Sequence, residues 1–197
     1  MPQANNWAPA CGPEELTMRI IDTESIALVV DLQERLMPAM HGGEELLANC
    51  RRFLEGLHIL GVPLLASEQY PKGLGATVPV IAEMLGDAPV LAKVSFSCMD
   101  DEAIRFRLAA SGRKTVLVIG VESHVCVAQT VIDLLAAGYR PVLVADCVSS
   151  RKPADRDLAI TRLREEGAIV TSSESLLFEL CRHAGTDRFK AISRLVK

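Results

Sequence analysis

Residues 115–146 read TVLVIGVESHVCVAQTVIDLLAAGYRPVLVAD, and this stretch decides the fold class. It begins with a β-branched run, Thr115–Ile119, continues with a helical pattern that is apolar on most faces, His124–Ala137, and ends with a second run, Pro141–Ala145. A strand, a helix and a strand in this order predict a right-handed crossover between parallel strands. Both runs are continuously apolar, which is typical of strands covered on both faces.

The same alternation of strands and helices extends over most of the chain. Four further runs predict strands: Ile26–Val30, Val62–Ala66, Val90–Lys93 and Ala168–Thr171. The segments between and after them predict helices: Glu44–Leu60, Thr77–Leu85, Asp100–Ala110, Pro153–Glu166 and Ser173–His183. This order predicts an α/β fold, a three-layer α/β/α arrangement that is doubly wound and Rossmann-like around a mainly parallel six-stranded sheet.

Composition limits the class of protein. The chain has 197 residues and a net charge of −4, which argues against a nucleic-acid partner because the whole chain would repel phosphates. No apolar run approaches the roughly 18 residues that span a bilayer, and the N-terminus lacks a secretory signal. We expect one domain over residues 17–197. Residues 1–16, rich in Pro, Asn and Ala, are interpreted as a flexible arm, the alternative being a segment ordered against a neighbouring subunit.

The six cysteines are irregularly spaced, without a CxxC pair or the short-range spacing of a zinc site. In a chain long enough to bury an ample core, this pattern favours reduced thiols and a cytoplasmic location. Four of the cysteines are interpreted as buried apolar fillers: Cys50, Cys98, Cys147 and Cys181.

Chemistry-bearing residues follow several of the predicted strands. Asp31 ends one apolar run, Lys93 ends another, Asp146 ends a third, and Cys126 lies in the turn and helix start after Ile119. Ligands of such sheets bind beyond the carboxyl ends of the strands. A thiol near the start of a helix and beside a lysine is expected to have a lowered pKa, and a carboxylate can accept its proton. Taken alone, the pattern is also compatible with a capping Asp and a core Cys.

Several motifs, in order, carry a resemblance to a known family: VVDLQ at 29–33, SEQYPKGLG at 67–75, KVSFS at 93–97, GVESHVCVAQTVIDLLAAGY at 120–139 and VADCVSSR at 144–151. They resemble the isochorismatase-like hydrolase superfamily, and within it the cysteine hydrolases and isochorismatase-domain proteins. The similarity runs from about residue 25 to residue 180 and implies the isochorismatase-like version of the fold.

The resemblance implies a catalytic triad of Asp31, Lys93 and Cys126. It also implies a cis peptide between Val121 and Glu122, and an oxyanion hole made by the backbone N–H groups of Glu122 and Cys126. In the implied reaction, Asp31 takes the thiol proton, Cys126 attacks a carbonyl, and water hydrolyses the covalent thio-acyl intermediate. The implied activity is hydrolysis of a small amide, carbamoyl or related C–N bond.

Two departures narrow this activity. Isochorismatases proper lack the nucleophilic cysteine, whereas Cys126 is present here, so we do not expect isochorismatase activity. Metal-dependent nicotinamidases carry a D-x-H pair where this chain has Glu68–Pro71, without a histidine. We therefore expect no metal and no cofactor.

Other residues near the predicted strand ends have open roles. Gln33 either faces a substrate pocket or is a polar residue at a helix start. Tyr70 and Phe96 line the substrate or belong to the core or an interface. His124 is two positions from Cys126, which points the two side chains in different directions on a helix, so it is interpreted as lining the pocket or capping rather than as the base. Asp146 is expected to orient the strand ends through hydrogen bonds to backbone.

The sequence thus favours a metal-independent cysteine hydrolase with a small-molecule substrate. The alternatives are a scaffold protein that retains the fold for assembly and a thiol redox sensor that uses Cys126. The resemblance also implies a homo-oligomer.

Overall fold

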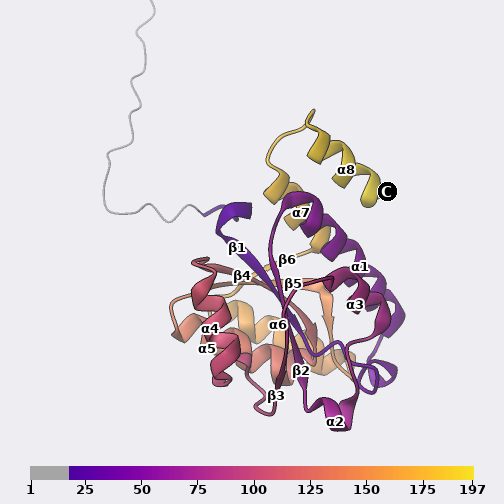
Figure 1. Cartoon of the computed structure of the whole chain (residues 1–197), viewed down its shortest axis with the longest axis vertical. Coiled ribbons are helices and arrows are strands. Elements are labelled where there is room, and N and C mark those ends of the chain that lie inside the picture. Colours follow the sequence, from indigo (N-terminus) through magenta and orange to yellow (C-terminus); the bar gives the residue numbers. More distant parts are fainter. Residues whose placement is uncertain (1–17) are drawn as a thin grey trace, which may run out of the picture.

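The computed structural model describes residues 18–197, so the predicted arm at 1–16 lies outside the described residues. Within residues 18–197, six strands form one parallel sheet in the order β3-β2-β1-β4-β5-β6 (Figure 1). The strands are β1 (Ser25–Val30), β2 (Leu64–Gln69), β3 (Val90–Lys93), β4 (Thr115–Val121), β5 (Arg140–Ser149) and β6 (Ile169–Thr171). The predicted α/β fold with a mainly parallel six-stranded sheet is confirmed.

Helices cover both faces of the sheet, which makes three layers (Figure 1). On one face lie α1 (Gly43–Leu60), α3 (Pro79–Leu85), α7 (Ser173–Cys181) and α8 (Asp187–Leu195). On the other face lie α4 (Glu102–Ala110), α5 (Ala128–Ala136) and α6 (Pro153–Glu165). A short helix, α2 (Pro71–Leu74), follows β2.

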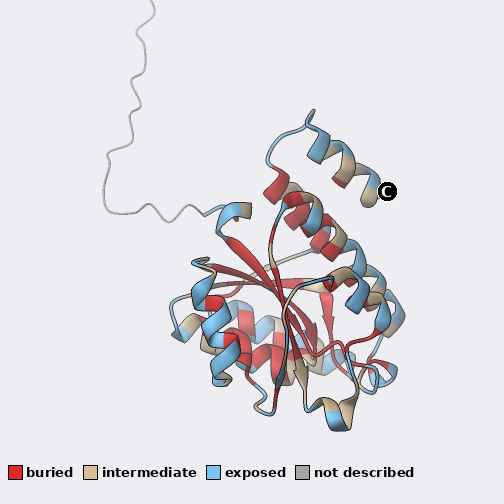
Figure 2. Ribbon diagram, viewed as in Figure 1, coloured by how far each residue is buried: buried red, intermediate tan, exposed pale blue. Residues whose placement is uncertain are grey.

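The two central strands, β1 and β4, carry side chains that are buried on both faces of the sheet, so helices must pack against both faces. Every residue of β1 and of β4 is buried (Figure 2). Alternate residues of β1 enter different cores: Ala27 and Val29 pack with α1 and α7, while Leu28 and Val30 pack with α4 and α5. The continuously apolar runs in the sequence therefore reflect burial on both sides.

Gly120, near the end of β4, allows β4 and β1 to approach closely. Its φ is +124°, and an added Cβ would overlap the carbonyl oxygen of Val30. A side chain at this position would therefore push β4 away from the backbone that leads into Asp31.

The structure differs from the sequence prediction at β5. This strand continues to Ser149, because its pairing with β4 shifts between Val118 and Gly120 and takes up extra residues. The sequence predicts Asp146 at the end of this strand, but in the structure Asp146 lies within it. Its carboxylate accepts hydrogen bonds from the backbone N–H (2.7 Å) and the hydroxyl (2.6 Å) of Ser173, at the start of α7.

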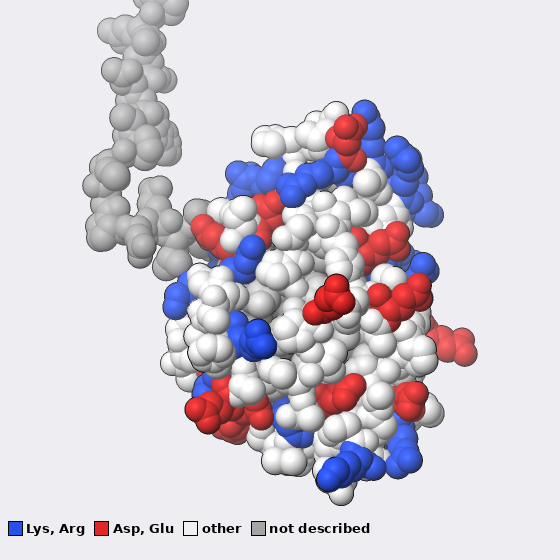
Figure 3. Space-filling view, viewed as in Figure 1, with Lys and Arg blue, Asp and Glu red and all other residues white. Residues whose placement is uncertain are grey.

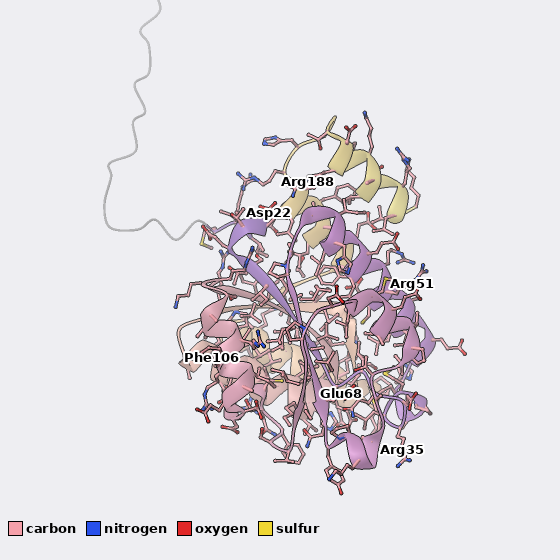
Figure 4. All side chains as sticks on the ribbon, viewed as in Figure 1. Asp22, Arg35, Arg51, Glu68, Phe106 and Arg188 are labelled. Atoms are coloured by element: carbon pink, nitrogen blue, oxygen red, sulfur yellow. The ribbon has the colours of Figure 1, made fainter. Side chains whose placement is uncertain are left out.

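The C-terminal helix α8 is attached to the body of the domain. Ile192 is buried in the core shared with α1 and α7. Arg188 pairs with Asp22 at 3.1 Å, and it also donates to the carbonyl oxygen of Leu60 at 2.7 Å (Figure 4). None of the helices in residues 18–197 is long and apolar enough to cross a membrane.

Candidate functional site

Asp31 and Lys93 form a buried ion pair at the carboxyl edge of the sheet. Asp31 directly follows β1 and Lys93 is the last residue of β3, with β2 between these two strands. The ammonium nitrogen of Lys93 lies 2.8 Å from Oδ2 of Asp31, and both side chains are fully buried. The parallel topology thus brings together two residues that are far apart in the sequence.

The Lys93 ammonium is surrounded by oxygen acceptors. Besides Asp31, it donates to Oε1 of Gln69 at 2.7 Å and to the carbonyl oxygens of Ser95 (3.2 Å) and Phe96 (3.1 Å). A buried cation is tolerated only when such partners replace its water shell. This arrangement keeps a fixed positive charge beside the Asp31 carboxylate.

Asp31 is held by both its backbone and its side chain. Its N–H donates to the carbonyl oxygen of Ser67 at 3.2 Å, and its Oδ1 accepts from the Ser67 hydroxyl at 2.7 Å. Its φ of +53° is in the left-handed region, which Asp tolerates better than most residues. The carboxylate is therefore fixed in one orientation.

Cys126 is the third member of this group. It lies in a π-helical turn, η4 (Ser123–Val127), that precedes α5, and its residue is 7% exposed. Burial raises the pKa of the Cys126 thiol to about 12; the charge of Asp31 raises it too, the charge of Lys93 lowers it, and a hydrogen bond with Asp31 adds to the rise. The predicted lowering of this pKa is wrong, because desolvation and Asp31 outweigh Lys93.

The turn before Cys126 has a distinctive backbone. The Val121–Glu122 peptide is cis. The N–H groups of Val125 and Val127 both donate to the carbonyl oxygen of Glu122, at 3.0 and 3.2 Å. The Glu122 carboxylate accepts from the backbone N–H (3.1 Å) and Nε (3.0 Å) of Arg151, which attaches the turn to the segment after β5.

Gln33 connects the β1 loop to β2. Its Nε2 donates to the carbonyl oxygens of Gln69 (3.0 Å) and Gly75 (2.7 Å), and its Oε1 accepts from the N–H of Gln69 at 2.7 Å. Backbone groups therefore occupy both ends of this buried amide. Gln33 holds Gln69 in place, and Gln69 in turn contacts Lys93.

Tyr70, Phe96 and His124 lie around this group. The N–H of Tyr70 donates to the Lys93 carbonyl at 2.8 Å, and the Phe96 carbonyl accepts from the Lys93 ammonium. These two aromatic residues are 54% and 55% exposed. His124 is half-buried, and its Nδ1 lies 2.9 Å from Oγ of Ser150.

The sequence prediction missed Ser67 and Gln69, and it interpreted Cys98 as an apolar filler near the predicted strand ends. All three belong to the site: Ser67 binds Asp31, Gln69 binds Lys93, and the Cys98 thiol donates to the Ser67 hydroxyl at 3.4 Å. A signal was present, because Ser67 and Gln69 are polar residues near the end of the strand that lies between Asp31 and Lys93.

A cavity of about 370 Å³ lies elsewhere, between α1, β5 and α6, with His41, Asn49 and Arg156 among its lining residues. Asp31, Lys93 and Cys126 do not line it, so we base the candidate site on the ion pair and not on this cavity. Among residues 18–197, no group of three or more His, Cys, Asp or Glu side chains is arranged to hold a metal ion. Glu68, where nicotinamidases have metal ligands, accepts hydrogen bonds from Thr77 instead.

The isochorismatase domain model matches residues 25–175, which include the whole of this site. The chain belongs to the isochorismatase domain family. Isochorismatase domain-containing protein 1 of Salmo salar is 39% identical over 178 residues, covering 90% of this chain and 62% of that protein. The chain thus spans less than two thirds of the length of this relative.

Two solved structures of family members are similar over nearly the whole chain. The MAR1 ribonuclease of Caenorhabditis elegans has a TM-score of 0.85 and 37% identity, covering 90% of this chain and 92% of that one. YcaC of Pseudomonas aeruginosa, solved with hexane-2,5-diol and covalent acrylamide, has a TM-score of 0.84 and 25% identity, covering 91% and 92%.

Proposed function

We propose that this protein is a metal-independent cysteine hydrolase that cleaves a small amide, carbamoyl or related C–N bond through a thio-acyl intermediate on Cys126. The observation that carries the proposal is the 2.8 Å Asp31–Lys93 ion pair, whose two charges both act on the Cys126 thiol. A base, a fixed cation and a sulfur nucleophile in one buried group are the parts that acyl transfer requires.

The raised pKa of Cys126 determines the order of proton transfer. With a pKa of about 12 the thiol is protonated at neutral pH, so the sulfur is activated only as its proton moves to Asp31. The sulfur then bonds to the substrate carbonyl carbon, and Asp31 returns the proton to the leaving nitrogen as the C–N bond breaks. Water attacks the thio-acyl carbon, gives a proton to Asp31 and releases the acid, and the proton returns to the sulfur.

Lys93 and the turn supply the electrostatic part of the mechanism. Lys93 remains paired with Asp31 and favours the anionic charge that develops on sulfur. We assign the oxyanion hole to the N–H groups of Glu122 and Cys126, which belong to the turn at the positive end of α5. Tyr70 and Phe96, which flank Lys93, are assigned to the substrate entrance, and His124 to its wall.

One similar structure and the raised pKa of Cys126 favour a hydrolase over a redox sensor. YcaC of Pseudomonas aeruginosa was solved with covalent acrylamide, a small amide with an alkene that nucleophiles attack. A thiol sensor needs an accessible thiolate of low pKa, whereas the pKa of Cys126 is raised. The scaffold alternative does not account for the buried charges beside Cys126.

The proposal is tested with a panel of small amides, ureas and carbamates. Their hydrolysis is measured as the release of ammonia or amine. Cys126→Ala and Asp31→Asn are each expected to reduce kcat/KM by about 10³-fold or more, because each removes a reacting group. Cys181→Ala is the matched control, a buried cysteine outside the site, and should retain activity. Dialysis against EDTA should change nothing. Full activity in Cys126→Ala would contradict the mechanism.

Two further predictions accompany the function. We expect a homo-oligomer, because Val94, 81% exposed, and Phe96 leave apolar surface uncovered beside the site. Sedimentation velocity would show a species heavier than 21.3 kDa. The cytoplasmic location stays a prediction from the cysteine pattern.

A further inference from the structure

Ser67 contacts Asp31 through both its backbone and its side chain. It lies in β2 opposite Val30 of β1, so the parallel register places it beside the residue that follows β1. Its carbonyl oxygen accepts from the Asp31 N–H, and its hydroxyl donates to Oδ1 of Asp31 at 2.7 Å. Ser67 is buried, so this hydroxyl bond has no competition from bulk water.

The direction of the Ser67 hydroxyl is fixed by a second contact. The Cys98 thiol donates to Oγ of Ser67 at 3.4 Å, and the Cys98 N–H is itself held by Oγ1 of Thr130 at 2.9 Å. Because Cys98 occupies an acceptor position on the hydroxyl oxygen, the single hydroxyl proton is directed to Asp31.

The two oxygens of Asp31 thus have different partners. Oδ1 accepts from Ser67 and Oδ2 accepts from Lys93. The titratable groups that face the carboxylate are Lys93 from β3, Cys126 from η4 and Cys98 from the turn before α4. Ser67 is the neutral donor in this set, so its removal changes hydrogen bonding to Asp31 without changing the charge of the site.

We propose that Ser67 is a positioning residue, which fixes the orientation and the hydrogen bonding of the Asp31 carboxylate for accepting the Cys126 proton. This inference rests on the proposed function. A hydrogen bond donated to a carboxylate favours its ionised form. Loss of the Ser67 hydroxyl should therefore remove one of the two donors that orient this carboxylate, and the reaction of Cys126 should be impaired most on the acidic side of the pH profile.

Labelling with acrylamide tests this step without needing the natural substrate. The sulfur of Cys126 bonds to the terminal alkene carbon, and the thiol proton passes through Asp31 to the neighbouring carbon. The labelling rate is measured against pH by intact mass, with peptide mapping to assign Cys126. We call the fall in labelling rate toward low pH the acidic limb of the profile. Ser67→Ala is expected to shift this limb to higher pH by about 1 unit and to slow labelling about 10-fold at neutral pH.

Controls separate positioning from general loss of stability. Ser25→Ala removes a hydroxyl bond from another buried serine, to the Ile21 carbonyl at 2.6 Å and partly buried, at the opposite end of the sheet, and should leave the pH profile of labelling unchanged. Ser67→Thr retains a hydroxyl and should restore the wild-type limb. If Ser67→Ala does not fold, Ser67→Cys, which has a weaker donor, should show a smaller shift in the same direction.

The outcomes distinguish the two proposals. A folded Ser67→Ala or Ser67→Cys variant with the wild-type limb overturns the role of Ser67, whether or not the enzyme turns over amides. A shifted limb in a protein that hydrolyses none of the amide panel supports the role of Ser67 and counts against the proposed function.

Discussion

At the scale of single residues, the cost of burying charge governs Asp31 and Lys93. Each is stable inside the protein only because the other is present, together with the oxygens around the ammonium. In an exposed ion pair, water solvates each charge when its partner is removed. The loss of stability on breaking the buried pair can therefore be compared with the loss on breaking an exposed one.

Lys93→Met should lower the free energy of unfolding by about 3–5 kcal/mol, because Asp31 is left buried without its partner. Arg162→Ala, which breaks the exposed Arg162–Glu166 pair at 3.5 Å, is the control and should change stability by less than about 1 kcal/mol. Urea unfolding at pH 7 measures both. Equal effects of the two substitutions would show that burial of the Asp31 pair has no special cost.

The thiol of Cys126 predicts a loss of stability at alkaline pH. Its pKa rises from 9.0 to about 12 on folding, so between these values the unfolded chain releases a proton that the folded chain keeps. The free energy of unfolding should fall across this window by about 1.4 kcal/mol per pH unit from this group, and it should be unaffected below pH 9.

Urea unfolding from pH 8 to pH 11 measures this effect as the difference between wild type and Cys126→Ala. Cys98 and Cys147 also have raised pKa values, chiefly from desolvation by burial, and both are present in the wild type and in the variant. Parallel stability curves for wild type and variant would be inconsistent with a raised Cys126 pKa.

At the scale of elements, the contact of β4 with β1 depends on one glycine. Gly120→Ala should lower the free energy of unfolding by about 3 kcal/mol or more, because an unfavourable φ is combined with overlap on Val30. Gly138→Ala, where φ is +77° and nothing lies within 4 Å, should cost only the backbone strain of about 1–2 kcal/mol. Urea unfolding measures the free energy of unfolding of both variants. A smaller loss of stability for Gly120→Ala than for Gly138→Ala would show that the contact of β4 with β1 does not depend on Gly120.

The elements also show what the sequence can predict. β3 runs from Val90 to Lys93 as expected, because its apolar residues and flanking polar residues are local signals. The end of β5 was placed wrongly, because the irregular pairing near Gly120 depends on the partner strand. Likewise, the motifs predicted Cys126 and its pairing with Asp31 but not the raised pKa of the thiol, since burial arises from packing between distant segments.

At the scale of the whole molecule, charge argues against RNA as the substrate. The chain has 25 acidic residues (Asp and Glu) and 21 basic residues (Lys and Arg). Figure 3 shows basic side chains gathered near α8 and mixed with acidic ones elsewhere on the face in view. A phosphate backbone would thus meet both attraction and repulsion.

Despite the name of the Caenorhabditis elegans relative, we expect no binding or cleavage of single-stranded RNA at 0.15 M salt, roughly physiological ionic strength. Fluorescence anisotropy with a labelled oligonucleotide and gel analysis of the same sample measure this. Sub-micromolar binding that weakens with salt would contradict the charge argument.

The strand order has a consequence for synthesis on the ribosome. Among residues 18–197, β1 emerges before the other strands, yet it lies at the centre and pairs with both β2 and β4. Until the segment that forms β4 has left the exit tunnel, the nascent polypeptide displays an apolar, unpaired strand edge, the kind of surface that chaperones bind and that promotes aggregation. Translation must therefore continue well beyond Val121, until β4 is outside the tunnel, before the most hydrophobic part of the sheet is protected.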